Sequence, residues 1–127
     1  MRKLYVTTVP LFDSDKNLKT HLIGTLSDKD GTYVFEYKLA GQFHERFLKI
    51  ADFPDAGGVY SGEQVQRFVY KIIPKRTSNH INLALKSAGL REYNEWALLK
   101  HFGPTTQLQN LRLCEVLPEG TIRYDAE

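Results

Sequence analysis

Residues 58–74 read GVYSGEQVQRFVYKIIP, and this stretch decides the fold because it contains the clearest helix signal in the chain. Four apolar residues recur at the i, i+3, i+4 and i+7 spacing of one helix face: Val65, Phe68, Val69 and Ile72. Ser61 occupies the N-cap position, and Gln64 three residues later completes a capping box. Pro74 lacks a backbone N–H and cannot continue the helix. The pattern therefore predicts an amphipathic helix over residues 61–73.

Before this helix, the chain has the alternating pattern that is typical of β-strands. We expect a polar loop over residues 13–19 and strands over residues 4–9, 21–26, 32–38 and 43–50. Asp30 and Gly31 provide the positive φ that a hairpin turn between the second and third of these strands requires. One face of the third strand is aromatic, with Tyr33, Phe35 and Tyr37, and packing in the core explains this face.

Beyond the helix, the periodicity predicts two more short helices, over residues 78–88 and 94–102, and a strand over residues 111–116. The expected N-caps are Ser78 and Asn94, and the expected terminating residues are Gly89 and Gly103. Residues 121–124 are expected to pair back on the sheet. The predicted fold class is α+β: a small, strongly bent antiparallel sheet or partial barrel, with three short helices packed at one side, in one domain over residues 1–127.

The composition is that of a single soluble globular domain. The chain has 127 residues, of which 42% are hydrophobic and 25% are charged, and its formal net charge is +2. Lysine and arginine are scattered, so direct nucleic-acid binding is not favoured. The expected core consists of apolar positions in the predicted elements: Leu4, Val6, Ile23, Leu26, Val65, Phe68, Val69, Ile72, Leu85, Leu99, Phe102, Leu113 and Val116.

The sequence also indicates a cytoplasmic protein. No apolar run reaches the ~18 residues of a membrane span, and the N-terminus lacks the apolar region of a signal peptide. The single cysteine, Cys114, lies in the apolar run 111–117. This position favours a buried, inert thiol and a reducing compartment.

The sequence contains no recognisable pattern of catalytic residues. None of the histidines lies at a metal-ligand spacing from a cysteine or another histidine; they are His21, His44, His80 and His101. Neither a phosphate-binding glycine loop nor a hydrolase nucleophile elbow occurs. We therefore expect no enzymatic activity, no metal and no cofactor.

Two groups of residues are candidates for a binding surface. Arg67 and Lys71 lie one turn apart on the predicted helix, away from its apolar stripe, and Lys75 and Arg76 follow its end. A solvated helix face explains these cations, and a docking patch for an acidic partner or a phosphate is the alternative. Trp96 has helical spacing with apolar residues, which makes it either a core residue or an aromatic anchor at an interface.

Four segments, taken in order, carry a resemblance to a known family: LIGTLSDKDGTYVFEYK (22–38), GVYSGEQVQRFVYKIIPKR (58–76), NEWALLKHFG (94–103) and LRLCEVLPEG (111–120). They resemble the N-terminal subdomain of HipA-family serine/threonine kinases over nearly the whole chain. The third segment is similar to a Phe-x-Leu-Leu-x-x-x-Gly helix, with Trp96 at the Phe position. The chain departs from the pattern where Lys71 and Ile73 replace the Asn and Leu of an Asn-x-Leu-Pro-type ending. The fourth segment resembles the family's Gly-Ala-Val-x-x-x-Pro-Glu strand, but its Gly-Ala pair is not reproduced.

In that family the subdomain precedes a kinase core, whose phosphate-binding loop and catalytic and metal-binding aspartates have no counterpart in this sequence. The resemblance therefore implies a stand-alone, HipS-like bacterial protein of a HipBST-type toxin–antitoxin system. Such a protein binds and inhibits a separately encoded HipA/HipT-type kinase. The surface residues that we expect to contact the kinase are Trp96, Tyr70, Arg67 and Lys71.

Two other functions stay open at this point. A small β-rich domain with exposed Tyr33, Phe35 and Tyr37 could stack the bases of a single-stranded nucleic acid, although the near-neutral charge argues against this. The domain could also be a scaffold that contacts a HipB-like helix-turn-helix repressor, as the N-terminal region of HipA proteins can.

Overall fold

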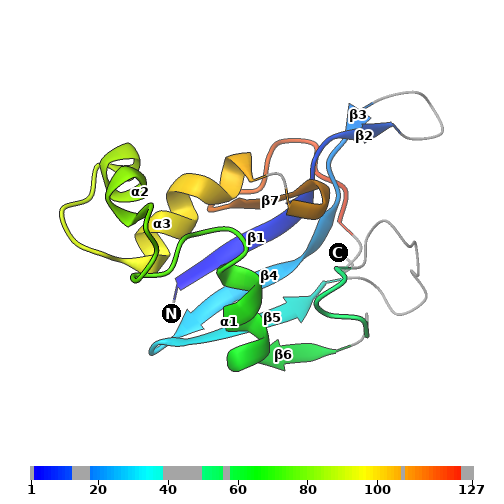
Figure 1. The fold of residues 1–127 in the computed structure, drawn as a ribbon. Helices are drawn as coiled ribbons and strands as arrows, with labels where there is room; N and C mark the ends of the chain where they lie inside the picture. Colours follow the sequence, from blue (N-terminus) through cyan, green and yellow to red (C-terminus); the bar gives the residue numbers. More distant parts are fainter. Residues whose placement is uncertain (1, 13–17, 39–49, 56–57, 107, 124–127) are drawn as a thin grey trace.

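The computed structural model describes residues 2–12, 18–38, 50–55, 58–106 and 108–123, and a five-stranded antiparallel sheet lies at its centre (Figure 1). The order of its strands is β6-β5-β4-β1-β7, and β2 and β3 form a separate two-stranded ribbon. The strands are β1 (Arg2–Thr8), β2 (Leu11–Phe12), β3 (Leu18–Lys19), β4 (Leu22–Lys29), β5 (Thr32–Tyr37), β6 (Val59–Ser61) and β7 (Leu111–Cys114). The helices of the described residues are α1 (Glu63–Val69), α2 (Ile81–Ala88) and α3 (Glu95–Phe102), with 3-10 turns η2 (Gly103–Thr105) and η3 (Leu108–Asn110). The predicted α+β class is confirmed, and the sheet that the described strands form is open.

Helices α1 and α3 pack against the same face of the sheet, and the hydrophobic core lies between them and the sheet. Helix α1 packs on β5 and β6, α3 packs on β7, and α2 packs on α3 beyond the sheet (Figure 1). The core residues come from both layers: Leu4, Val6, Ile23, Leu26, Phe35, Leu113, Val65, Phe68, Val69, Leu98 and Leu99. The opposite face of the sheet presents exposed side chains such as Lys3, Glu36 and Arg112.

The hairpin between β4 and β5 forms where the sequence predicts it. Asp30 and Gly31 adopt φ values of 53° and 88°, the two positive angles of a tight hairpin turn. The carboxylate of Asp28 accepts a 2.8 Å hydrogen bond from the Gly31 N–H, which fixes the turn. Gly24 in β4 permits a close approach, because a Cβ atom there would lie 2.4 Å from the Glu36 carbonyl oxygen.

Helix α1 is shorter than predicted, and its capping box does not form. Ser61 belongs to β6, and Gly62, with φ 72°, turns the chain into the helix without a side-chain cap. The amide of Gln64 instead donates to the Asp52 carbonyl oxygen at 2.8 Å. The regular helix ends at Val69, and single turns continue it to Ile73, whose N–H donates to the Val69 carbonyl oxygen at 3.0 Å.

Helices α2 and α3 agree more closely with the sequence. Asn94 caps α3 as predicted, since its Oδ1 accepts the Ala97 N–H at 3.0 Å. Gly89 ends α2 in the left-handed conformation, but α2 begins three residues after its predicted cap Ser78. Gly103 does not end the helical conformation, which runs on into η2. It is required for packing instead, because a Cβ atom there would lie 2.8 Å from the Leu113 Cβ.

Most of the predicted core is buried, with one clear error. Nine of the predicted residues are fully buried: Leu4, Val6, Ile23, Leu26, Val65, Phe68, Val69, Leu99 and Leu113. Ile72, Leu85 and Phe102 are partly buried and pack against that core. The prediction that Val116 belongs to the core is wrong, because β7 ends at Cys114 and leaves Val116 78% exposed.

Some expectations fall wholly or partly outside the described residues. The expected strand over 43–50 lies outside them except for Ile50, which forms an isolated bridge with Phe53. Most of the expected loop over 13–19 lies outside as well, although Leu18–Lys19 forms β3. Of residues 121–124, Ile122 forms an isolated parallel bridge with His21, and residue 124 lies outside.

The packing of the core predicts how much stability is lost when the Phe68 side chain is shortened to alanine. Phe68 is fully buried, and its ring centroid lies 5.2 Å from that of Phe53. Substitution of Phe68 by Ala should lower the free energy of unfolding by ~3–5 kcal/mol, because the lost transfer energy and the remaining cavity add. Denaturant unfolding measures this, with the 70%-exposed Leu83→Ala as a control that should change stability by under about 0.5 kcal/mol. A loss below about 1 kcal/mol in Phe68→Ala would contradict the packing.

Candidate functional site

A groove of about 520 Å³ runs along the exposed side of α1. It is lined by Asp52, Glu63, Gln64, Arg67 and Lys71. Two of the four residues predicted to contact a partner, Arg67 and Lys71, therefore lie together, one helical turn apart. The lining holds two acids and two bases, so the groove is polar and of mixed charge.

The two ion pairs in the groove differ in burial. The Arg67 guanidinium lies 2.8 Å from Glu63, and both side chains are more than two-thirds exposed. An exposed pair of this kind contributes little to stability, so either partner is available to another molecule. The Lys71 ammonium lies 2.7 Å from Asp52, whose side chain is only 8% exposed. This second pair belongs to the framework beneath the groove.

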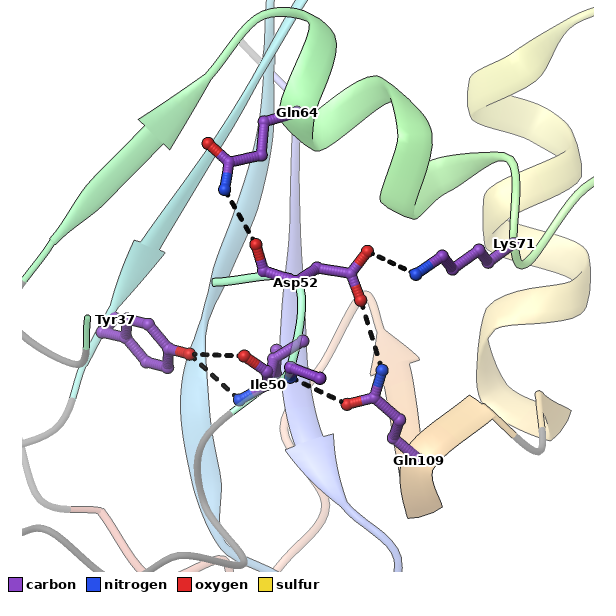
Figure 2. Close-up of polar contacts among 7 residues, drawn as sticks. Tyr37, Ile50, Asp52, Gln64, Lys71 and Gln109 are labelled. Atoms are coloured by element: carbon purple, nitrogen blue, oxygen red, sulfur yellow. Dashed lines mark hydrogen bonds and ion pairs between the residues drawn. The ribbon is translucent and has the colours of Figure 1, made fainter. Parts of the chain in front are cut away.

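Asp52 connects three parts of the chain beneath α1 (Figure 2). Its carboxylate accepts from Lys71 at 2.7 Å and from the Gln109 amide at 3.2 Å, and its carbonyl oxygen accepts from Gln64. The Gln109 side chain also accepts the Ala51 N–H at 3.0 Å. Gln109 adopts φ 51°, an angle that a non-glycine residue rarely takes, and these two bonds hold it there. The floor of the groove is therefore fixed from α1, η3 and the turn at residues 50–53.

The hydroxyl of Tyr37 anchors the same turn from the sheet (Figure 2). It accepts the Ile50 N–H at 3.0 Å and donates to the Phe53 carbonyl oxygen. Burial raises the pKa of Tyr37 to about 12. The phenol is therefore neutral at physiological pH and able to donate.

Tyr70, the third predicted contact residue, points toward the carboxylate of Glu95 rather than into the groove. Glu95 accepts the Tyr70 hydroxyl and, at 2.8 Å, the Tyr33 hydroxyl. The Tyr93 hydroxyl shares its one proton between Glu95 at 3.3 Å and the closer Pro74 carbonyl oxygen at 2.9 Å. The hydrogen bond to Glu95 and then burial raise the pKa of Tyr70. Burial, followed by the hydrogen bond to Glu95, raises the pKa of Tyr33, and burial, followed by the charge of Glu95, raises the pKa of Tyr93. We call these four residues the Glu95 cluster.

Trp96, the fourth predicted contact residue, is a core side chain. It is 5% exposed, and the Arg2 guanidinium lies 5.3 Å from the centroid of its ring. The structure thus separates the four residues: Arg67 and Lys71 lie in the groove, Tyr70 is partly buried in the Glu95 cluster, and Trp96 is buried. An aromatic anchor at Trp96 is not available on the surface.

The described residues offer little for metal or thiol chemistry. They contain no group of three or more His, Cys, Asp or Glu side chains that could hold a metal ion. Burial raises the pKa of the half-buried Cys114 thiol, which keeps the thiol protonated. None of the described helices is long and apolar enough to cross a membrane.

Comparisons of the chain with protein-family models, with curated proteins and with solved structures gave no match. The case for a function therefore comes from the residues themselves.

Sequence reasoning missed Asp52, Glu95 and Gln109. Their partners are distant in the chain: Glu95 meets Tyr33 across 62 positions, and Gln109 meets Asp52 across 57. No local spacing encodes such contacts. The one available signal was the position of Glu95 in the first turn of α3, directly after the N-cap Asn94.

The Glu95 cluster makes a prediction that spectroscopy can test. Glu95→Gln removes the negative charge and one strong acceptor, so Tyr33, Tyr70 and Tyr93 should ionise at lower pH than in the wild type. The substitution should also cost about 1–2 kcal/mol of unfolding free energy. An absorbance titration of tyrosinate and a denaturant titration measure the two effects. Glu92→Gln, in the exposed loop before α3, is the control; identical tyrosine titrations of Glu95→Gln and the wild type would contradict the cluster.

The raised pKa of Tyr37 gives a second prediction, to which the raised pKa values of Tyr33, Tyr70 and Tyr93 contribute in the same direction. Tyrosine ionises near pH 10 in an unfolded chain, whereas Tyr37 in the fold has a pKa of about 12. The unfolded state therefore loses its proton first, so the free energy of unfolding should be constant up to about pH 10 and fall between about pH 10 and 12. Denaturant titrations at about pH 8, 10 and 11 measure the decline. An unfolding free energy at about pH 11 equal to that at about pH 8 would exclude it.

Proposed function

We propose that this domain is an antitoxin-like protein that binds and inhibits a separately encoded HipA/HipT-type serine/threonine kinase. The observation that carries the proposal is the ordered resemblance of four segments to the N-terminal subdomain of such kinases. Those segments form β4–β5, β6–α1, α3 and β7, which together supply most of one core. A subdomain that packs its own core can act apart from the kinase chain that it resembles.

The groove beside α1 is the surface that we assign to the kinase. Arg67 is exposed, and among the residues that the structure describes its ion-pair partner is the exposed Glu63, so it can exchange that partner for one on another protein. The floor beneath it is held by Asp52, so the groove is preformed. A partner bound in trans lacks a tether, whose effective concentration would be about millimolar. We therefore expect an interface of roughly 1,200–2,000 Å².

The nucleic-acid alternative loses the residues on which it depends. Tyr33, Phe35 and Tyr37 lie on the covered face of the sheet and are 6%, 0% and 7% exposed. Their rings pack in the core, where no base can stack on them. The repressor-scaffold alternative gains no observation among the described residues.

Kinase binding is tested with a HipA-type kinase that lacks its own N-terminal subdomain and is encoded in the same genome. The domain should bind it stoichiometrically in a calorimetric titration and reduce its autophosphorylation. Arg67→Glu should weaken binding about tenfold or more, or about 1.4 kcal/mol, since it replaces a cation in the groove with an acid. Arg112→Glu, on the opposite face of the sheet, is the control and should change the affinity less than twofold. Absence of binding by the folded wild type at about 100 μM kinase would refute the proposal.

A further inference from the structure

Residues 64–91 carry charge of only one sign. This stretch holds six of the seventeen basic residues of the chain and none of the fifteen acidic ones. The remainder of the chain therefore has eleven basic and fifteen acidic residues, a net charge of the opposite sign. The six cations are Arg67, Lys71, Lys75, Arg76, Lys86 and Arg91. These six cations lie in the last part of α1, in α2 and in the segments on either side of α2.

Two of these cations are stacked on tyrosine rings. The Lys75 ammonium lies 5.3 Å from the centroid of the Tyr70 ring, and the Arg76 guanidinium lies 4.9 Å from that of the Tyr93 ring. The faces of aromatic rings attract cations. Both ring hydroxyls reach the Glu95 carboxylate, so the two rings are held by one group.

The backbone before the two cations is fixed as well. The Tyr93 hydroxyl donates to the Pro74 carbonyl oxygen at 2.9 Å, and the Ser78 N–H donates to the Lys75 carbonyl oxygen at 2.9 Å. Pro74 itself restricts φ. Lys75 and Arg76 are therefore exposed side chains on a well-held segment, rather than the tip of a long loop.

No acidic side chain in the described part of the chain forms an ion pair with Lys75 or Arg76. Within the described residues, Arg67 and Lys71 form ion pairs with acids, whereas neither Lys75 nor Arg76 does. The Glu95 carboxylate, which holds the Tyr70 and Tyr93 rings, accepts tyrosine hydroxyls instead of pairing with either cation. Two adjacent, positioned and unpaired cations can bind carboxylates without first breaking an internal ion pair.

We propose that Lys75 and Arg76, on the platform of Tyr70, Tyr93 and Glu95, are a docking site for an acidic segment of a protein partner. The planar guanidinium of Arg76 can hold an aspartate or glutamate carboxylate in two parallel hydrogen bonds, and Lys75 adds a second charge. The inference rests on the proposed function only in that it takes the partner to be a protein. Residues 64–91 carry only positive charge, so a partner segment that binds them through its charge must be acidic.

The test uses a fluorescein-labelled peptide of eight glutamates, titrated with the full-length domain by fluorescence anisotropy. The wild type should bind it, and raising NaCl from about 50 to about 300 mM should weaken binding several-fold. Lys75→Gln/Arg76→Gln should weaken binding about fivefold or more. Lys29→Gln/Arg112→Gln removes the same charge from exposed sites outside residues 64–91, and should change binding less than twofold. Near-UV circular dichroism verifies that each variant is folded.

Three results would overturn the inference. They are no binding of the peptide by the folded wild type at about 1 mM, equal weakening by the two double variants, and tighter binding of a single-stranded oligonucleotide with eight phosphates. The last result would indicate a nucleic-acid surface in place of a protein one. The peptide test is independent of the kinase titration: a domain that binds the peptide through Lys75 and Arg76 but no kinase would lose only the proposed function.

Discussion

One carboxylate, that of Glu95, ties the helical layer to the sheet. Tyr33 comes from β5, Tyr70 from the end of α1 and Tyr93 from the segment before α3, and all three hydroxyls converge on it. A partly buried carboxylate is costly unless it is hydrogen-bonded, and a buried hydroxyl without an acceptor is costly in the same way. Glu95 therefore satisfies the hydroxyls of Tyr33 and Tyr70, and shares that of Tyr93 with Pro74, only when the sheet, α1 and α3 are in their native positions. The N-terminus of α3 also favours a negative charge at this position.

Asp52 fixes the other side of α1 by the same principle. Gln64 in the first turn of α1 and Lys71 just after its end both bond to Asp52, while Tyr70 bonds to Glu95. A helix of this length would not be stable alone in water. Its two ends are held by polar contacts and its middle by the buried Val65 and Phe68. Its exposed side is therefore presented in a defined orientation.

The sequence predicted those parts of the fold that depend on neighbouring residues. The turn at Asp30 and the cap at Asn94 are local devices, and the apolar stripe that includes Phe68 has a helical period; each has the expected place in the structure. Strand β6 was missed because it exists through pairing with β5, about 25 residues earlier. The capping box at Ser61 failed for the same reason: pairing places Ser61 in β6, so the chain turns at Gly62 instead.

For the candidate site, the sequence could predict which residues are positively charged. It could not predict which of these cations are free to bind a partner. Arg67, Lys71, Lys75 and Arg76 look alike in the sequence, as four cations spread over ten residues. In the fold, Asp52 pairs with Lys71 and Glu63, one turn earlier in α1, pairs with Arg67, while tyrosine rings hold Lys75 and Arg76. A partner that engages Lys71 must break its ion pair with the largely buried Asp52, so the net gain is small. A partner that engages a cation on an aromatic ring keeps the existing contact and adds a new one. The affinity for an acidic partner should therefore depend on Lys75 and Arg76 more than on Lys71. The net charge of +2 gives no sign of this difference between the cations.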